Sequence, residues 1–280
     1  MSESVQRVFL ITGASSGFGR AFAQAALAAG HVVIGTVRSE AAKATFEQLH
    51  AERAHGLVLD VTDFDRIDAA VAEATVVTGP VDVLINNAGY GHEGTLEESS
   101  LDELLRQFNV NVFGAVAMTK AVLPSMRVRR TGHIINMTSM AGLVTFPGIA
   151  YYSGSKFALE GISESLAQEV RGFGIKVTAI APGSFRTDWA GRSMVRSERS
   201  IADYDAVFGP VRRARQAKDG RQAGDPAKAA KVLLDLVDHP DPPVHLVLGS
   251  DALSLVRQKF SSMRSVVDAW EGVSRSTDFS

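Results

Sequence analysis

The sequence of 280 residues has no cysteine, no long apolar run and no excess of either charge. Without cysteine it can form no disulfide, no thiolate metal site and no cysteine nucleophile, and a reducing cytoplasm is the expected compartment. No run approaches the about 18 consecutive apolar residues of a membrane span. The 29 basic and 31 acidic side chains nearly balance, which argues against a nucleic-acid-binding protein. We therefore expect a soluble cytoplasmic protein with no membrane or nucleic-acid partner.

Short apolar runs rich in β-branched residues recur along the chain and alternate with helical patterns. The runs are Val8–Thr12, Val32–Thr36, Leu57–Asp60, Val81–Ile85, His133–Met137, Lys176–Ile180 and Val244–Leu248. The helical patterns are Phe18–Ala29, Glu40–Arg53, Phe64–Val77, Leu101–Arg130, Ser153–Phe173, a segment from Pro226 to about Val237, and Leu253–Glu271. Continuous apolar runs are typical of strands buried on both faces. The alternation predicts one α/β domain over residues 1–280, with a doubly wound, mainly parallel seven-stranded sheet and helices on both faces.

The segment 184–224 interrupts this alternation. It contains eight arginines and no clear strand, and it follows the carboxyl end of the strand Lys176–Ile180. Long insertions at that end of a parallel sheet often cover the ligand crevice. We expect a substrate lid here; a surface excursion or a subunit contact is the alternative.

A glycine-rich turn joins the strand Val8–Thr12 to the first helix. Gly13, Gly17 and Gly19 follow that strand directly. Such a turn lets backbone N–H groups meet a pyrophosphate at a helix N-terminus. The spacing differs from the general G-x-G-x-x-G pattern, and a purely structural turn is the alternative.

The end of the second strand bears on the choice of nucleotide. NAD-specific folds usually place an acidic residue there, which bonds the ribose 2′-hydroxyl. Here Val37 stands at that position and Arg38 follows it. Because a guanidinium can pair with a 2′-phosphate, we favour NADP(H) as the cofactor, with NAD(H) possible. The alternative is an ordinary solvated arginine.

Tyr152 and Lys156 are four residues apart at the start of a helical pattern, and so share one helix face. A phenol has an ordinary pKa of about 10. A neighbouring ammonium is expected to lower that pKa and make proton exchange with a substrate oxygen feasible. A surface i,i+4 pair is the alternative.

Further polar residues follow the predicted strands. Ser139 comes after the strand His133–Met137 and can hold a substrate oxygen, with Thr138 as the alternative hydroxyl. Asn111 lies within a long helical pattern, where asparagine is disfavoured. It can hold a water that connects Lys156 to solvent, or it can simply bend the helix.

Together these residues resemble the short-chain dehydrogenase/reductase family, over roughly Val8 to Thr187. Asn111, Ser139, Tyr152 and Lys156 match its catalytic tetrad, and Asn86 to Gly89 match the sheet-stabilising motif beside the cofactor. The resemblance implies that Tyr152 is the acid/base, Ser139 positions the substrate oxygen, Lys156 binds the nicotinamide ribose, and Asn111 anchors a relay water.

The resemblance also implies a cofactor site along the strand ends. Its expected residues are Gly13, Ser15, Ser16, Gly17, Phe18, Gly19, Arg38, Asp60, Val61, Asn87, Ala88, Gly89, Tyr152, Lys156, Pro182, Gly183 and Thr187. Two departures stand out. NADP-preferring members often have a basic residue in the glycine turn, where this chain has Ser15 and Ser16, and the family pattern covers the region after Ser184 poorly.

We therefore expect an oxidoreductase that moves a hydride between NADP(H) and a carbonyl or secondary alcohol of a hydrophobic small molecule. Expected pocket residues are His92, Met140, Leu143, Phe146, Phe185, Trp189 and Met194. We interpret His92 as a loop residue rather than a base. Since no His, Asp or Glu cluster has metal-ligand spacing, we expect no metal. The alternatives are an NADP(H)-sensing regulatory protein and an epimerase or dehydratase. By analogy with the family, the helices Leu101–Arg130 and Ser153–Phe173 predict a homodimer or homotetramer.

Overall fold

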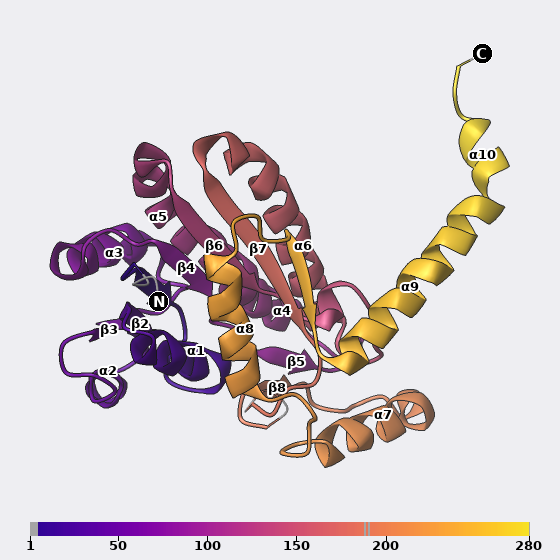
Figure 1. Cartoon of the computed structure of the whole chain (residues 1–280). Coiled ribbons are helices and arrows are strands. Elements are labelled where there is room, and N and C mark those ends of the chain that lie inside the picture. Colours follow the sequence, from indigo (N-terminus) through magenta and orange to yellow (C-terminus); the bar gives the residue numbers. More distant parts are fainter. Residues whose placement is uncertain (1–4, 188, 190, 280) are drawn as a thin grey trace.

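Seven parallel strands form the central sheet, in the order β3-β2-β1-β4-β6-β7-β9 (Figure 1). The computed structural model describes residues 5–187, 189 and 191–279. The strands are Val8–Ile11 (β1), Val32–Val37 (β2), Ala54–Val58 (β3), Val83–Asn86 (β4), Gly91–Glu93 (β5), Gly132–Met137 (β6), Ile175–Pro182 (β7), Met194–Arg196 (β8) and His245–Leu248 (β9). This arrangement confirms the predicted doubly wound parallel sheet.

Helices connect the strands and cover both faces of the sheet. The α-helices are Gly17–Ala28 (α1), Glu40–Glu47 (α2), Phe64–Thr78 (α3), Leu101–Phe108 (α4), Ala115–Arg129 (α5), Ala150–Val170 (α6), Asp205–Ala217 (α7), Pro226–Asp238 (α8), Ser250–Ala269 (α9) and Glu271–Arg275 (α10). A π-helical segment, Asn109–Gly114, joins α4 to α5, and short 3₁₀ turns span Met140–Gly142, Arg171–Phe173 and Ala202–Tyr204.

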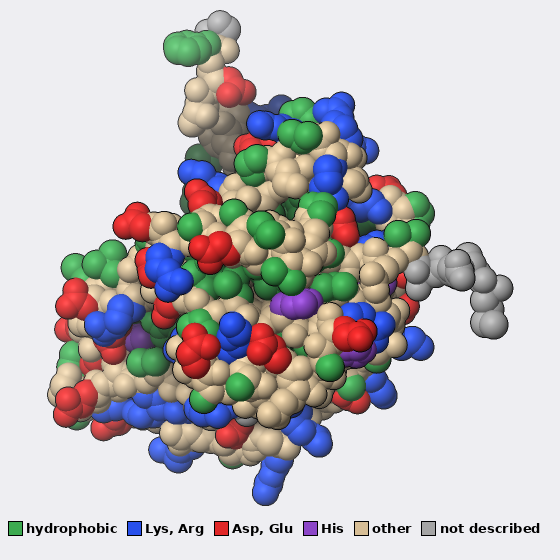
Figure 2. All heavy atoms as spheres, turned by 90° about the vertical axis from the view of Figure 1, so that its left-hand side faces the viewer, with side chains coloured by type: hydrophobic (Ala, Val, Ile, Leu, Met, Phe, Trp, Pro, Cys, Tyr) green, Lys and Arg blue, Asp and Glu red, His purple; other side chains and the backbone are tan. Residues whose placement is uncertain are grey.

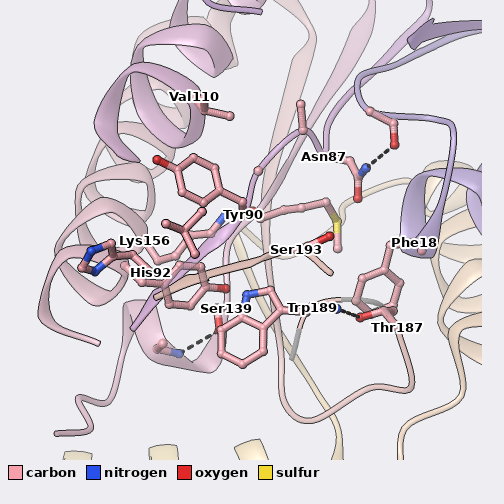
Figure 3. Close-up of a pocket in the computed structure, with 18 of the residues that line it drawn as sticks. Phe18, Asn87, Tyr90, His92, Val110, Ser139, Lys156, Thr187, Trp189 and Ser193 are labelled. Carbon is pink, nitrogen blue, oxygen red and sulfur yellow. Dashed lines mark hydrogen bonds between the residues drawn. The ribbon is translucent and has the colours of Figure 1, made fainter. Parts of the chain in front are cut away.

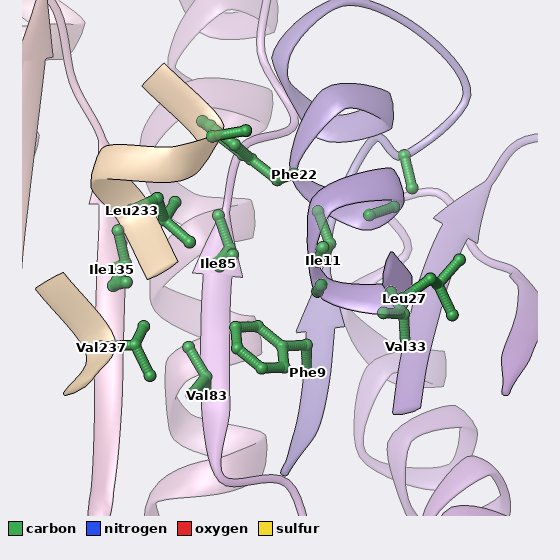
Figure 4. Packing of buried hydrophobic residues seen from close by; sticks show 14 of the residues in the cluster. Phe9, Ile11, Phe22, Leu27, Val33, Val83, Ile85, Ile135, Leu233 and Val237 are labelled. Carbon is green, nitrogen blue, oxygen red and sulfur yellow. The ribbon is translucent and has the colours of Figure 1, made fainter. Parts of the chain in front are cut away.

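Alternate residues of each central strand enter opposite cores. On β1, Phe9 and Ile11 pack with α1 and α8, including Phe22 and Leu233 (Figure 4). Leu10 faces the other way and packs against α3, α5 and α6. Successive side chains of a strand point to opposite faces of the sheet, and here both faces are covered by apolar layers. This explains why the central strands are hydrophobic at nearly every position.

Several helix ends follow from local chemistry. The Asp225 carboxylate accepts a hydrogen bond from the Ala227 N–H at 2.8 Å, and Pro226 opens α8, as the sequence predicts. Gly30 follows α1 with a φ of +91°, a conformation that glycine adopts without the penalty of a Cβ.

Some predicted boundaries were wrong. The helical pattern Leu101–Arg130 is interrupted at Asn109–Gly114, whereas Pro124 lies inside the continuous helix α5. The helix predicted over Glu40–Arg53 ends at Glu47, because Ala54 already begins β3. Helix propensities do not show where the backbone hydrogen bonds of a helix change from the α-helical to the π-helical spacing, so the segment Asn109–Gly114 could not be predicted.

The segment 184–224 was predicted to have no strand, and this was wrong. Its β8 pairs in parallel with β5, and it also contains helix α7. Three residues are too few to show a hydrophobic alternation. Residues 188 and 190 of this segment lie outside the described residues.

Acidic and basic side chains are interspersed on the face of the molecule shown in Figure 2. None of the described helices combines the length and the apolar character that crossing a bilayer requires.

Candidate active site

A cavity of about 1250 Å³ opens at the carboxyl ends of the central strands. Arg38, which follows β2, and Ser139, which follows β6, both line it from opposite sides of β1 and β4, with the glycine turn between them. Figure 3 shows Ser139, Lys156 and Trp189 in the part beyond β6. Ligands in open parallel sheets bind at this edge, where the strand order reverses direction. Here the reversal lies between β1 and β4, which are neighbours in the sheet.

The glycine turn presents unbonded helix N–H groups to the cavity. Gly13 and Gly17 adopt φ values of +66° and +53°, which disfavour residues with a Cβ. A Cβ on Gly19 would come within 2.3 Å of the Gly13 carbonyl oxygen, so Gly19 is required by the turn itself. Ser16 precedes α1 but makes no capping bond through its side chain. The first N–H groups of α1 are therefore free to meet an anion.

The segment after β4 is braced against this turn. The Thr12 hydroxyl accepts hydrogen bonds from the N–H groups of Asn87 and Ala88, both at 2.9 Å. The Asn87 amide donates to the carbonyl oxygens of Thr12 and Gly13 at 2.9 and 3.2 Å. These bonds fix the floor of the cavity between its two ends.

The far end of the cavity carries the residues expected to choose the nucleotide. Arg38 is exposed at its edge and makes no ion pair with any part of the chain that the structure describes. The Asp60 carboxylate accepts from the N–H and the hydroxyl of Thr62 at 2.9 and 2.7 Å. Val61 is buried beside it and lines the cavity. The Arg38 guanidinium is thus available to a ligand.

At the opposite end, three of the four expected catalytic residues line the cavity. Tyr152 is only 5% exposed, and its ring lies 5.2 Å from that of Trp189. Ser139 precedes the 3₁₀ turn, and its hydroxyl accepts from the Ala141 N–H at 3.1 Å. Lys156 donates to the Met137 carbonyl oxygen at 2.8 Å. Helix α6 and the end of β6 therefore bring these side chains together.

The expected lowering of the Tyr152 pKa was wrong for this structure. Burial raises the pKa of Tyr152 to about 12, although interactions with Ser139 and Trp189 oppose the rise. Burial also lowers the pKa of Lys156 to about 8, against the effect of the Glu160 carboxylate. Desolvation is the largest influence on the Tyr152 pKa, and the Lys156 ammonium, whose Nζ lies 5.8 Å from the ring centre, is not among the groups that shift it. Tyr152 is thus a protonated phenol at neutral pH.

Asn111 lies one layer behind the cavity, in the π-helical segment. Its amide donates to the Tyr90 carbonyl oxygen at 3.2 Å and to Ser155 Oγ at 3.1 Å. Its carbonyl oxygen accepts from the Tyr90 N–H at 3.1 Å. A Cβ on Gly89 would lie 3.0 Å from that oxygen and 3.6 Å from Lys156 Nζ, so the backbone of Gly89 passes close to both side chains. The expectation that Asn111 anchors a water remains a prediction.

The buried carboxylate of Glu160 bonds the hydroxyl of Thr138 but not that of Ser139. Glu160 accepts from the Thr138 hydroxyl at 2.5 Å and lies 2.7 Å from His245 Nδ1. The same hydroxyl lies 2.8 Å from the Ile180 carbonyl oxygen, which is the other acceptor within reach of its single hydrogen. Because the Thr138 hydroxyl is bonded inside the protein, Ser139 is the better candidate for a substrate contact.

The expected substrate pocket is partly right. Met140, Phe146, Phe185, Trp189 and His92 line the cavity, whereas Leu143 and Met194 do not. Met194 lies in β8 and packs beside Gly91.

His92 was predicted to be a loop residue, but it lies in β5 and is buried. Its Nε2 lies 3.0 Å from the Ser197 hydroxyl. Burial lowers the pKa of His92, although Glu103 opposes this.

Some residues that line the cavity were not predicted from the sequence. Tyr90 follows the Asn86–Gly89 motif directly, and its position after a strand end could have indicated it. Arg106 on α4, and Arg215 and Lys218 at and just after the end of α7, also line the cavity. Nothing in their local sequence separates them from surface cations. Among the described residues, no group of His, Asp and Glu is arranged to hold a metal.

Comparisons with known proteins agree with this geometry. Residues 7–196 match the family model described as short chain dehydrogenase. A solved short-chain dehydrogenase of Streptomyces avermitilis superposes with a TM-score of 0.91 and 44% identity, covering 98% of this chain and all of that one. A short chain dehydrogenase/reductase of Burkholderia phymatum, solved in complex with NAD, gives 0.82 and 29%, covering 94% and 96%. The 3-ketodihydrosphingosine reductase of Bacteroides thetaiotaomicron is 39% identical, with 92% of each chain covered.

Proposed function

The chain belongs to the short-chain dehydrogenase/reductase family of NAD(P)-dependent oxidoreductases, and we propose that it reduces the carbonyl group of a hydrophobic small molecule with NADPH, using Tyr152 as the acid. The observation that carries this proposal is the buried, protonated Tyr152 beside Ser139 at one end of a cavity whose other end is the exposed Arg38. A carbonyl oxygen between the two hydroxyls accepts a proton as its carbon is reduced.

The cavity fits a dinucleotide along its length. The free N–H groups at the start of α1 suit the pyrophosphate, and Ser15, Ser16 and Phe18 lie around them. Asp60 and Val61 would hold the adenine end, while Pro182, Gly183 and Thr187 would flank the nicotinamide. Arg38 is placed to pair with a 2′-phosphate, which supports NADPH over NADH. When bound, the cofactor supplies the hydride.

The protein's own residues handle the proton. Tyr152 donates its hydroxyl proton to the substrate oxygen, and Ser139 donates a hydrogen bond that holds that oxygen in place. With a pKa of about 8, Lys156 is mostly charged at pH 7 and stabilises the phenolate that Tyr152 becomes. Asn111 would hold the water through which the proton returns.

The lining of the substrate end supports an apolar substrate. Phe146, Ile149 and Trp189 surround the Tyr152 ring in one small cluster. A relative bearing the name 3-ketodihydrosphingosine reductase places long-chain ketones among the substrates to test. Segment 184–224 would act as the lid, since Val211, Ala214 and Lys218 face the same cavity.

The proposal is tested by Tyr152→Phe. Loss of the acid is expected to lower kcat by about 10²–10⁴-fold, while NADPH binding, followed by nucleotide fluorescence, stays close to that of the wild type. Wild-type turnover in the variant would remove Tyr152 from this role.

A further inference from the structure

Helix α9 leaves the body of the molecule and continues into α10 as a projecting arm (Figure 1). Ala252 and Val256 are buried at its base. From Phe260 to Phe279, every residue is exposed. An isolated helix of this length gains little stability from its own hydrogen bonds, so the arm is expected to pack against something.

Four exposed apolar residues of the arm form one stripe, which ends at Trp270, the C-cap of α9; Val266 and Val273 lie beside it, 54% and 57% exposed. Phe260, Met263, Val267 and Trp270 are 58%, 48%, 61% and 61% exposed. Their successive spacings of three, four and three residues are those of the a and d positions of a coiled coil. Such a narrow stripe fits a single partner helix.

We propose that the arm pairs antiparallel with the arm of a second copy of this chain. In that register Phe260 packs against Trp270 of the partner subunit, and Met263 packs against Val267 of the partner subunit. The two-fold axis passes beside residue 265, so all four exposed seam residues are covered at once. A self-complementary surface of this kind produces a closed dimer.

The residues beside the seam support the same register. Arg257 of one arm lies opposite Glu271 of the partner subunit, a carboxylate that also pairs with Arg275 on its own helix at 2.7 Å. Val266 meets its own copy at the two-fold axis. Arg264 also approaches its copy there, but its charge is offset by Asp268 on the same helix, 3.8 Å away.

The size of the contact is in the range of a specific interface. Aromatic side chains bury about 150–250 Å² each when fully covered. Because Phe260 and Trp270 are 58% and 61% exposed, the four in the two arms contribute roughly 350–600 Å². With the methionine and valine contacts, the pairing approaches the roughly 1,000 Å² expected of a specific complex. It does not involve the faces of α4, α5 and α6, from which the family resemblance predicts subunit contacts.

The first test compares two double variants of the full chain. Phe260→Asp with Val267→Asp places charges in the seam, and Gln258→Asp with Ser265→Asp places the same charges at the same spacing on the opposite face. We expect light scattering to give the seam variant half the molar mass of the wild type and of the control, with NADPH binding retained in all three. Equal masses in all three would overturn the proposal.

Cysteine cross-linking tests the register, because the natural chain has no cysteine. Under oxidising conditions Val266→Cys is expected to form a disulfide-linked dimer, whereas Met263→Cys and Ser265→Cys are not. Cross-linking of Met263→Cys alone would indicate a parallel pair. Equal masses combined with seam-dependent sedimentation on phosphatidylserine vesicles would assign the stripe to a lipid surface instead. Either result overturns the antiparallel dimer.

Discussion

Burial shifts the two titratable residues of the candidate active site in opposite directions. Tyr152 and Lys156 are both removed from water, so each is pushed toward its neutral form, with pKa values of about 12 and 8. A neutral phenol is a proton donor, which suits reduction of a carbonyl. The lysine stays mostly charged at neutral pH because the Glu160 carboxylate partly offsets its desolvation.

Glu160→Gln therefore tests the electrostatics of the lysine. Removing the carboxylate charge lowers the pKa of Lys156 further, so the alkaline decline of kcat/KM, expected near pH 8 for the wild type, moves to lower pH. The pH profile of NADPH-dependent reduction measures this shift. Glu164→Gln is the control, because Glu164 is mostly exposed and lies only near His245 Nε2, at 3.6 Å. An activity loss that is equal at every pH would show that Glu160 is only a structural tether.

Arg38→Asp tests the choice of nucleotide. A charge-assisted hydrogen bond contributes about 1.5–3 kcal/mol, so kcat/KM for NADPH is expected to fall by roughly tenfold or more, while that for NADH stays constant or rises. The ratio of the two kcat/KM values is the measurement. Arg171→Asp, far from the cavity, controls for net charge. An unchanged ratio would contradict the 2′-phosphate contact.

Individual site residues could be predicted from the sequence in two cases: where their partners are close in the chain, and where they follow the end of a strand. Tyr152 and Lys156 share a helix face, and Ser139 follows β6. Arg215 could not be found in this way, because only the packing of α7 over the sheet edge brings it to the cavity. The raised pKa of Tyr152 could not be predicted from the sequence either, because the desolvation that raises it depends on tertiary packing, including the Trp189 ring that lies against it.

Among the secondary-structure elements, one buried carboxylate anchors the candidate lid. Glu93 of β5 is fully buried at its side chain and contacts Arg196 of β8, and Arg212 and Arg215 of α7, at 3.2, 3.2 and 2.5 Å. A single charge therefore joins the sheet edge to two elements of the segment 184–224.

Glu93→Gln is expected to loosen this segment. Removing one partner of a buried ion pair costs about 3–5 kcal/mol, and here three guanidiniums lose a counter-charge. We predict a lower free energy of unfolding and faster tryptic cleavage within residues 197–224. Glu97→Gln is the matched control, because Glu97 bonds only the exposed Tyr204 hydroxyl. Equal cleavage rates in the two variants would show that the carboxylate does not hold the lid.

The elements found from the sequence were those with strong hydrophobic periodicity. All seven strands of the main sheet overlap predicted apolar runs, and the central ones are buried on both faces. The edge strand β3 is only partly buried, and it spans Ala54–Val58 rather than the predicted Leu57–Asp60. The π-helical segment was missed since Asn109 to Gly114 have no distinctive composition. Strand β8 was missed because it pairs in parallel with β5, a strand about a hundred residues earlier in the chain.

In the molecule as a whole, buried histidines connect stability to pH. Burial, assisted by the positive charges of Lys176 and Arg7, lowers the pKa of His133 to about 3. In the unfolded chain its pKa is about 6.5. The unfolded state therefore binds more protons below that value, and the stability present above pH 6.5 is lost as the pH falls toward 3.

His133→Gln tests this linkage. Between about pH 6 and pH 4, the slope of unfolding free energy against pH is expected to decrease by about 1.4 kcal/mol per pH unit relative to the wild type. Urea unfolding at several pH values gives the slope, whatever the variant's absolute stability. His239→Gln, at an exposed site, is the control. An unchanged slope in His133→Gln would place the acid sensitivity elsewhere.

We propose above all that this chain reduces a carbonyl with NADPH. It is tested most directly by the absorbance of the reduced nicotinamide, with wild-type protein, NADPH or NADH, and a panel of hydrophobic aldehydes and ketones that includes long-chain 3-keto compounds. We predict substrate-dependent oxidation of NADPH well ahead of NADH, and a rate about 10²–10⁴-fold lower with Tyr152→Phe. Binding of NADPH without oxidation of either cofactor across the panel, or equal rates with Tyr152→Phe, would contradict it.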